Sequence, residues 1–269
     1  MKFNNNEKTN IEIPDIQNYG DIRSISIDKV GIKNIKIPIN VLKTNNTVLS
    51  TIGIWKATVA LPSDKKGTHM SRFVSILEKY KYLNINQRIF SDMALEMIKL
   101  LEAETGEICV KFDYFLEKEA PLSKTKSTMN YKVKWIATIN NNNIKFKSFI
   151  NIPITSLCPC SKAISKYGAH NQRSKITISV RPHDNSILNI DHIIKLVEKE
   201  ASCELWSLLK RSDEKYVTER AYNNPKFVED LVRDIAVQLN SLQNIQCYTI
   251  EAENFESIHN HSAYAKIEK

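Results

Sequence analysis

The chain has 269 residues, of which 42% are hydrophobic and 25% are charged, the proportions of an ordinary globular protein. This composition excludes a wholly disordered chain, and no apolar run reaches the roughly 18 residues that a membrane-spanning helix needs. The first ten residues are polar and lack the apolar stretch of a secretory signal. We therefore expect a cytoplasmic protein that does not bind a membrane.

The excess of basic residues favours an anionic partner. Lys and Arg number 38 against 30 Asp and Glu, which gives a net charge of +8. A nucleic acid, a membrane surface or a phosphorylated small molecule would suit this charge, and a solvated basic surface without any function explains it equally well. The basic residues are scattered and no nucleic-acid motif stands out, so a small polyanionic substrate explains the charge as well as a nucleic acid does. Taking the charge together with the motifs described below, we expect such a substrate and no nucleic acid.

Hydrophobic alternation and spacing predict the elements of the first half. Apolar residues alternate with polar ones in the segments expected to be strands, and Ile89, Met93, Met97 and Leu101 recur every four residues, as in an amphipathic helix. Gly106 is expected to end this helix. The expected order is strands over 22–43 and 51–61, a loop over 62–72, the helix at 89–101, and strands over 108–115 and 131–139.

The second half repeats this order after an expected turn at 140–143, where four asparagines follow one another. Asp191 is the expected N-cap of one helix, and Asn224-Pro225 the expected start of another. The expected elements are a strand from 144 to 150, an irregular stretch over 156–174, a strand over 175–182, a helix from 191 to 208, a linker, a helix through 228–239, and strands over 247–255 and 262–269.

The two halves together predict the α+β class, with two antiparallel sheet-plus-helix modules in tandem. Helices are expected to pack on one face of each sheet, and a partner sheet or a second subunit would cover the other face. We expect a flexible N-terminal tail over 1–20, a first module over 21–140, and a second module over 141–269 that carries most of the functional residues.

The cysteines point to a metal or a reactive thiol rather than to disulfides. There are five of them, an odd number, in a chain without an expected secretory signal. Cys109, Cys203 and Cys247 lie in apolar patterns and are expected to be buried. Cys158 and Cys160 instead share the irregular stretch with His170, and thiolate and imidazole are preferred ligands of zinc and similar ions. A structural loop with an incidental thiol remains the alternative.

Other polar residues have weaker signals. Glu214 lies in the expected linker and Glu229 in the first turn of the last helix, where a solvated linker and a carboxylate that complements the helix dipole are the ordinary explanations. Glu256, His259 and His261 lie between the last two strands, either at the surface or as ligands. The loop GTHMSR at 67–72, preceded by Lys65 and Lys66, is either a basic turn or a phosphate contact.

Four segments resemble the motifs of the type IB GTP cyclohydrolase I family. They are CPCSKAISKYGAHNQRS (158–174), LKRSDEKYVTERAYNNPKFVEDLVRDIA (209–236), ENFESIHNHSAYA (253–265) and LPSDKKGTHMSRF (61–73). The resemblance covers roughly residues 20–269. It implies a tunnelling fold, whose modules form a barrel across the subunits of a homotetramer. It also implies conversion of GTP and water to 7,8-dihydroneopterin triphosphate and formate, the first step of tetrahydrofolate biosynthesis.

The same resemblance implies a divalent metal ion (zinc, manganese or iron) and roles for individual residues. Cys158 matches the metal-binding cysteine, His170 and Glu214 match positions in or next to the metal shell, and Cys160 matches a second active-site cysteine. His259 matches an active-site histidine that is either a ligand or a proton donor. For the substrate, the expected residues are Glu229 at the guanine ring, Glu256 as a further carboxylate, and Lys66, His69, Arg72 and Lys162 near the triphosphate.

Two rival functions remain open at the level of sequence. A nitrile reductase of the same fold would use a cysteine nucleophile, a glutamate anchor and NADPH without a metal. A basic binding module without catalysis would use Cys158 and His170 to hold a structural zinc, in a closed site with four protein ligands. The combination of Cys158, His170 and Glu214 favours metal-assisted hydrolysis over both.

Overall fold

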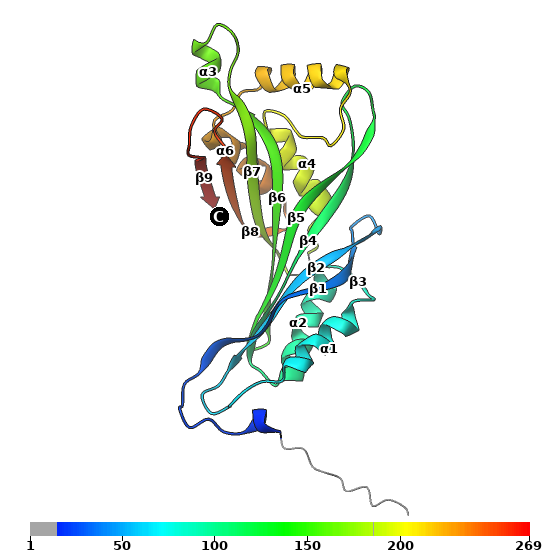
Figure 1. Ribbon diagram of the computed structural model, residues 1–269, viewed down its shortest axis with the longest axis vertical. Helices are drawn as coiled ribbons and strands as arrows, with labels where there is room; N and C mark the ends of the chain where they lie inside the picture. Colours follow the sequence, from blue (N-terminus) through cyan, green and yellow to red (C-terminus); the bar gives the residue numbers. More distant parts are fainter. Residues whose placement is uncertain (1–14, 185) are drawn as a thin grey trace, which may run out of the picture.

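One long antiparallel sheet runs the length of the protein (Figure 1). In the computed structural model, residues 15–184 and 186–269 are described, and within them nine strands pair in the order β3-β1-β2-β4-β5-β6-β7-β8-β9. All neighbouring strands are antiparallel except β1 and β3. The strands are β1 (Ile27–Leu42), β2 (Val48–Leu61), β3 (Asn84–Ile85), β4 (Thr105–Glu119), β5 (Lys126–Asn140), β6 (Asn143–Leu157), β7 (Asn171–Pro182), β8 (Ile245–Asn254) and β9 (Ala263–Glu268).

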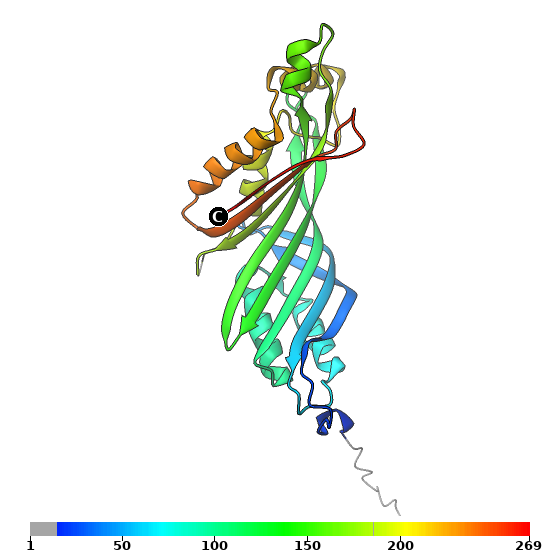
Figure 2. The same cartoon turned by 90° about the vertical axis from the view of Figure 1, so that its left-hand side faces the viewer.

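The longer amphipathic helices cover one face of this sheet, as expected for the α+β class (Figure 2). Helices α1 (Met70–Tyr80) and α2 (Gln87–Leu101) cover the first half, and α4 (Ile190–Glu200) and α6 (Val228–Asn240) cover the second. The short α3 (Pro159–Ile164) and the polar α5 (Arg211–Asn223) lie at the upper end of the molecule in Figure 1. No helix within the described residues is long and apolar enough to cross a membrane.

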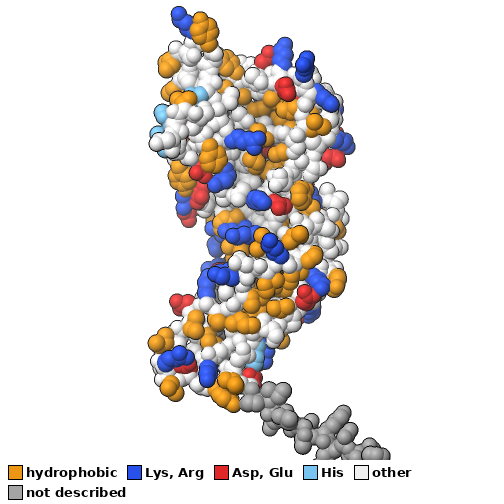
Figure 3. Space-filling view, in the orientation of Figure 1, with side chains coloured by type: hydrophobic (Ala, Val, Ile, Leu, Met, Phe, Trp, Pro, Cys, Tyr) orange, Lys and Arg blue, Asp and Glu red, His pale blue; other side chains and the backbone are white. Residues whose placement is uncertain are grey.

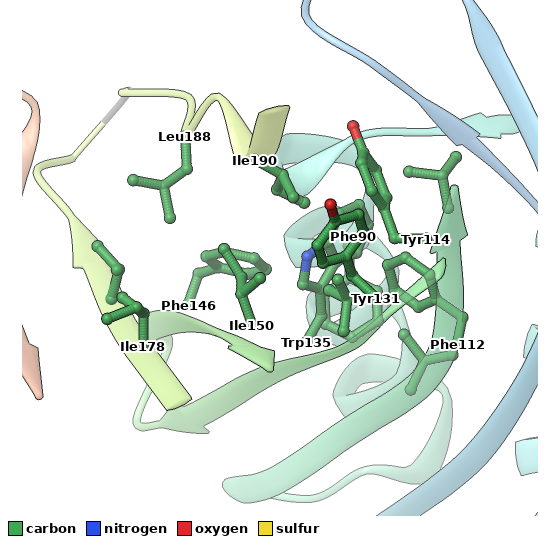
Figure 4. Close-up of a cluster of buried hydrophobic side chains, with 14 of the residues drawn as sticks. Phe90, Phe112, Tyr114, Tyr131, Trp135, Phe146, Ile150, Ile178, Leu188 and Ile190 are labelled. Carbon is green, nitrogen blue, oxygen red and sulfur yellow. The ribbon is translucent and has the colours of Figure 1, made fainter. Parts of the chain in front are cut away.

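The core forms because alternate residues of each strand face the helices. Trp135 of β5 is 1% exposed and packs edge-on against Phe90 of α2, with ring centroids 5.6 Å apart, and against Phe112 of β4 at 5.1 Å (Figure 4). Phe146 of β6 also contacts Trp135, at 5.9 Å. Since burial of one large apolar side chain contributes about 1.5–3 kcal/mol, this aromatic cluster is a major source of stability. The same apolar cluster continues into the second half through Ile150 and Ile178 (Figure 4).

The expected turn after β5 is confirmed and joins the two halves directly. Asn141 and Asn142 have φ angles of 48° and 62°, the left-handed conformation that asparagine tolerates and that a two-residue hairpin requires. Asn140 pairs with Asn143 across the turn, so β5 continues into β6 without leaving the sheet. The division into modules over 21–140 and 141–269 stays a proposal, and residues 1–14 of the expected tail lie outside the described residues.

The predicted boundaries around the first helices need two corrections. The loop predicted over 62–72 is shorter, because α1 begins at Met70 and buries Phe73, Ile76 and Leu77 at helical spacing. Gly106 does not end α2. Glu102 takes the left-handed C-cap position with φ 50°, and Gly106 lies in β4, where a Cβ would come within 2.9 Å of the Thr58 carbonyl oxygen.

Both predicted helix starts in the second half are wrong by two to three residues. Asn189, not Asp191, caps α4, because its Oδ1 accepts a hydrogen bond from the backbone N–H of His192. Helix α6 begins at Val228 with Phe227 as N-cap, because the Asn224 side chain is used elsewhere: its Nδ2 donates to the Ala201 carbonyl at 2.8 Å.

The predicted helix over 191–208 and the linker after it also change. Helix α4 ends at Glu200, because the next residues turn to pair with β6. The predicted linker contains α5, which has almost no apolar stripe and buries only Asp213 and Ala221. Apolar periodicity could not reveal such a helix, because its position is fixed by polar contacts.

Candidate active site

The end of β6 places Cys158 at the upper end of the sheet. The segment after α4 supports it, since the backbone N–H of Thr155 donates to the Cys203 carbonyl at 3.0 Å and Ser202 Oγ accepts the N–H of Leu157 at 3.1 Å. Burial raises the pKa of the Cys203 thiol to about 11, so this cysteine serves packing. The predictions that Cys109 and Cys203 are buried are confirmed, whereas Cys247 is only half-buried.

Cys158 begins helix α3 as its N-cap. Its Sγ accepts a hydrogen bond from the backbone N–H of Ser161 at 3.4 Å, and Pro159 takes the first helical position, where no N–H is needed. Cys158 is half-buried, and Cys160 is exposed on the same short helix; both are free thiols. The two sulfur atoms therefore have different surroundings, as one metal ligand and one separate thiol would.

His170 lies next to Cys158 although eleven residues separate them in sequence. The backbone N–H of Cys158 donates to the His170 carbonyl at 3.1 Å, and the N–H of His170 donates to Ser161 Oγ at 3.2 Å. The imidazole Nδ1 is 3.0 Å from Gln172 Oε1 and 3.8 Å from the carboxylate of Glu256. The structure thus brings together Cys158, His170 and Glu256, which the sequence had placed in two separate motifs.

The loop between β8 and β9 closes the same end of the sheet. The backbone N–H of Phe255 donates to the Arg173 carbonyl at 3.1 Å, which sets Glu256 beside His170. His259 and His261 follow in this loop, both exposed, with their rings stacked 4.9 Å apart. His259 is accessible to a substrate or a second subunit.

The start of α6 carries Glu229 to the same end of the sheet. The backbone N–H of Lys226 donates to the Leu157 carbonyl at 3.2 Å, one residue before Cys158. Lys226 also holds Glu200 and Asp234 through its Nζ atom, at 3.4 and 2.8 Å. Glu229 itself lies in the first turn of α6 and is exposed, so its carboxylate is free to accept hydrogen bonds from a ligand.

Helix α5 carries Glu214 and is held by its neighbour, Asp213. The Asp213 side chain is fully buried and accepts hydrogen bonds from the backbone N–H groups of Leu122, Ser123 and Lys210, each at 2.9 Å. Burial alone would raise the pKa of this carboxyl, but these bonds and the Ser123 hydroxyl hold its pKa well below the usual range. Glu214 is exposed on the first turn of the helix so anchored.

The depressed pKa of Asp213 makes a prediction about acid stability. A carboxyl whose pKa is lower in the folded protein stabilises the fold above its unfolded pKa of about 3.9, and the contribution is lost as the pH falls through the folded value. Asp213→Asn should therefore lower the unfolding free energy at neutral pH and flatten its decline in acid. Urea titrations across the acid range test this, with Asp230→Asn, at a half-exposed side chain of α6, as the control. A slope equal to that of the wild type would contradict the prediction.

The predicted metal ligands are only partly assembled in one chain. Across residues 15–184 and 186–269, no three or more His, Cys, Asp or Glu side chains lie in position to hold a metal ion together. Cys158 and His170 are neighbours, whereas Glu214 and His259 are exposed on separate elements. A metal site built from all four residues would require a side-chain or loop movement, or a second subunit.

The predicted triphosphate residues divide between the two ends of the molecule. Lys162 lies on α3, and its Nζ donates to the Tyr222 carbonyl at 2.5 Å. Lys66, His69 and Arg72 lie at or just before α1. This helix is at the opposite end of the molecule from α3 (Figure 1). There His69 Nε2 is 3.2 Å from Asp15, and the Arg72 guanidinium donates to the Leu100 carbonyl at 3.0 Å.

The face shown in Figure 3 does not gather its positive charge into one patch. Lys and Arg side chains are spread over the face shown in Figure 3, with apolar and neutral side chains between them. This distribution agrees with the scattered basic residues of the sequence. The net charge alone therefore does not locate an anion site.

Sequence reasoning missed the polar residues beneath His170. Gln172 and Ser174 occupy the positions of β7 that are in phase with buried Ile176 and Ile178, and both are buried. A polar side chain at a core position needs a hydrogen-bond partner, so this break in the apolar pattern was the available signal.

Comparison with known families decides the membership of the chain. A family model described as type I GTP cyclohydrolase FolE2 matches residues 13–265. The protein belongs to this FolE2 family. The match extends over nearly the whole resemblance seen in the sequence and includes all four motifs.

Curated relatives of the FolE2 family match over almost their full length. The GTP cyclohydrolase FolE2 of Bordetella petrii is 53% identical over 256 residues, covering 95% of this chain and 96% of its own. FolE2 2 of Dechloromonas aromatica is 53% identical, covering 95% and 94%, and FolE2 of Paraburkholderia xenovorans is 50% identical, covering 96% and 95%. This FolE2 chain therefore has no large insertion or deletion relative to them.

Solved structures support the fold of this FolE2 protein. The uricase of Arthrobacter globiformis aligns with a TM-score of 0.52 and 8% sequence identity, covering 90% of this chain and 93% of its own. A hyper-thermostable variant of that uricase aligns with a TM-score of 0.50. At such low identity the likeness concerns architecture alone, and it agrees with the expected tunnelling-type arrangement of an antiparallel sheet with helices on one face.

Proposed function

We propose that this protein hydrolyses GTP to 7,8-dihydroneopterin triphosphate and formate, the first step of tetrahydrofolate biosynthesis. The observation that carries the proposal is the convergence of Cys158, His170 and Glu256 at one end of the sheet, in a chain that belongs to the FolE2 family. The start of α6 adds Glu229 to the same region.

The donor chemistry at this end fits a divalent metal ion. Cys158 is a free, half-buried thiol, and its backbone N–H donates to the carbonyl of His170, so a sulfur and a nitrogen ligand of the preferred kinds come from neighbouring residues. Glu214 and His259 are the further candidate ligands. The chemistry that zinc, manganese or iron supplies when bound in such a site is acidification of a water molecule, from a pKa near 16 to about 7.

The remaining steps fall to side chains of the protein. Glu229 would accept hydrogen bonds from the N1 and 2-amino groups of guanine and so hold C8 at the metal end of the site. His170 or His259 would protonate N7 as water adds at C8, a role that suits an imidazole near neutral pH. Ring opening and a second hydrolysis then release formate, and the ribose carbons close the new ring. Cys160 lies on α3 beside this site as a second thiol.

The division of basic residues between the two ends favours a site shared between subunits. Lys162 lies near Cys158, but Lys66, His69 and Arg72 lie at the other end of the folded molecule. A homotetramer in which sheets from several copies close into a barrel would set the α1 end of one copy beside the α3 end of another. The helix-free face of the sheet would line such a barrel.

A direct assay tests the proposed reaction. The purified protein is incubated with GTP and Zn²⁺, Mn²⁺ or Fe²⁺ in turn, formate is quantified, and the mixture is then oxidised to reveal a fluorescent pterin. We expect formate and pterin in equal amounts with at least one of these ions and neither after chelation. Metal-replete protein that binds GTP but yields neither product would overturn the proposal.

Replacing Glu229 with alanine tests the guanine anchor. Loss of hydrogen bonds to a charged group costs about 1.5–3 kcal/mol, which corresponds to roughly 10- to 100-fold in kcat/KM for GTP. We expect that loss to arise from a higher KM while the bound metal content stays the same. Steady-state kinetics and metal analysis measure the two effects, with Glu219→Ala on the exposed face of α5 as the matched control. Wild-type kinetics in Glu229→Ala would reject the anchoring role.

A further inference from the structure

A chain of three buried polar side chains leads from the core to His170. Gln172 is 9% exposed, Ser156 2% and Ser174 1%. The Gln172 Nε2 group donates to Ser156 Oγ at 3.0 Å, and the Ser156 and Ser174 hydroxyls are 2.8 Å apart. At its other end, Gln172 Oε1 lies 3.0 Å from Nδ1 of His170.

The nitrogen and the oxygen of the Gln172 amide have different hydrogen-bond partners. With its Nε2 group donating to Ser156, the amide presents its oxygen to the imidazole. A carbonyl oxygen can only accept a hydrogen bond, so Nδ1 of His170 must carry the proton. The neutral imidazole then has its lone pair on Nε2.

The surroundings of the ring agree with this assignment. Glu256, the other acceptor near the imidazole, also lies on the Nδ1 side, but at 3.8 Å it is beyond hydrogen-bond distance. No described residue forms a hydrogen bond with Nε2 of His170 in the structure. The protein therefore supports one nitrogen of the ring and leaves the other open on the side away from Gln172.

We propose that Gln172, held by Ser156 and Ser174, is a positioning residue that fixes His170 in the Nδ1–H tautomer and so keeps Nε2 available to a metal ion or a substrate. The role of the free nitrogen rests on the proposed function, whereas the tautomer itself does not. Gln172 lies on the face of β7 that also carries Ile176, Ile178 and Val180, and this role explains why a polar side chain is buried there. Mutation of a side chain that hydrogen-bonds to a metal ligand commonly lowers metal affinity by about 10- to 100-fold.

Nitrogen NMR of the full-length, metal-free protein tests the tautomer directly. Protein labelled with ¹⁵N only in histidine is sedimented and measured by solid-state NMR at a pH well above the usual histidine value of about 6.5. The His170 signals are assigned by their loss in His170→Gln. We expect protonated Nδ1 and bare Nε2 in the wild type; the opposite tautomer would overturn the proposal, whether or not the protein turns over GTP.

Variants of the chain test how the tautomer is fixed. Gln172→Leu removes the acceptor, Gln172→Glu restores one, and Ser156→Ala removes the anchor while leaving the glutamine. We expect Gln172→Leu to mix the tautomers and to weaken Mn²⁺ or Zn²⁺ binding by about 10- to 100-fold in chelator competition. Gln172→Glu should restore the tautomer and most of the affinity, and Ser156→Ala should fall between the two. The control is Gln243→Leu, at an exposed glutamine between α6 and β8.

The tautomer of His170, measured beside the kinetic constants, separates positioning from general damage. A misplaced imidazole should lower kcat with little change in the KM for GTP, whereas loss of folded protein lowers the active fraction and leaves the tautomer of the remainder unchanged. An unaltered tautomer together with wild-type metal affinity in folded Gln172→Leu would refute the role of Gln172. Absence of GTP turnover in the wild type would instead count against the proposed function alone.

Discussion

Cys158→Ser should lose both the bound metal ion and formate release. A cysteine sulfur is a preferred metal ligand, whereas a serine hydroxyl stays protonated at neutral pH and does not replace it. Removal of a side chain that only hydrogen-bonds to a metal ligand lowers activity by roughly 10- to 100-fold, and the loss in Cys158→Ser should be larger. Metal content by elemental analysis and formate release measure the two effects in the same preparation.

Serine is chosen because it preserves the local structure around residue 158. Cys158 is the N-cap of α3 and accepts the Ser161 N–H, and a serine oxygen at this position is a preferred capping group. Loss of function in Cys158→Ser therefore reports the sulfur and not the helix. Cys247→Ser, at a half-buried thiol of β8 with no assigned role, is the matched control. A Cys158→Ser enzyme with full metal content and normal turnover would remove this residue from the ligand set.

The largest effect on stability is expected from Lys118→Ala. The Lys118 ammonium lies 2.8 Å from the Glu198 carboxylate, with side-chain exposures of only 13% and 5%. Burial raises the pKa of Glu198 despite this pairing, which shows how costly the buried charge is. Leaving one member of such a pair alone typically costs about 3–5 kcal/mol of unfolding free energy. Denaturant titration at a fixed protein concentration measures it.

Two further variants show whether Lys118→Ala destabilises the protein through the unpaired charge of Glu198 or through lost packing. Lys118→Met combined with Glu198→Gln removes both charges and leaves an amide oxygen to accept from Tyr131, whose hydroxyl donates to Glu198 at 2.7 Å. This pair should recover much of the stability lost in Lys118→Ala. Lys126→Ala, from an exposed pair with Glu117, should cost no more than about 1 kcal/mol. Equal losses in Lys118→Ala and Lys126→Ala would contradict the argument.

Most strands were predictable because apolar and polar residues alternate along them in the sequence. Strands β5 and β7 bury every second residue, and the Asn-rich turn between β5 and β6 has a conformation that asparagine favours. Helix α5 was not predictable by the same means, since its anchor is the buried carboxylate of Asp213. The N-caps of α4 and α6, Asn189 and Phe227, depend on which side chains tertiary contacts already occupy, and a sequence does not show that.

The candidate site was predictable as a set of residues but not as an arrangement. The motif that contains Cys158 and His170 is local, and its two residues are joined through their backbones. The proximity of Glu256 depends on β7 and β8 being neighbours, which sequence spacing alone does not give. The sequence marks Gln172 only as a break in the apolar alternation of β7, and its role emerges only from its hydrogen-bond partners.

The uninterrupted passage from β5 into β6 has a mechanical consequence. Because the two halves share one ladder of backbone hydrogen bonds and one apolar interior, they cannot swing about a hinge like two lobes joined by a linker. Motion that admits GTP or releases product must therefore come from the loops at the ends of the sheet, while the sheet itself stays rigid.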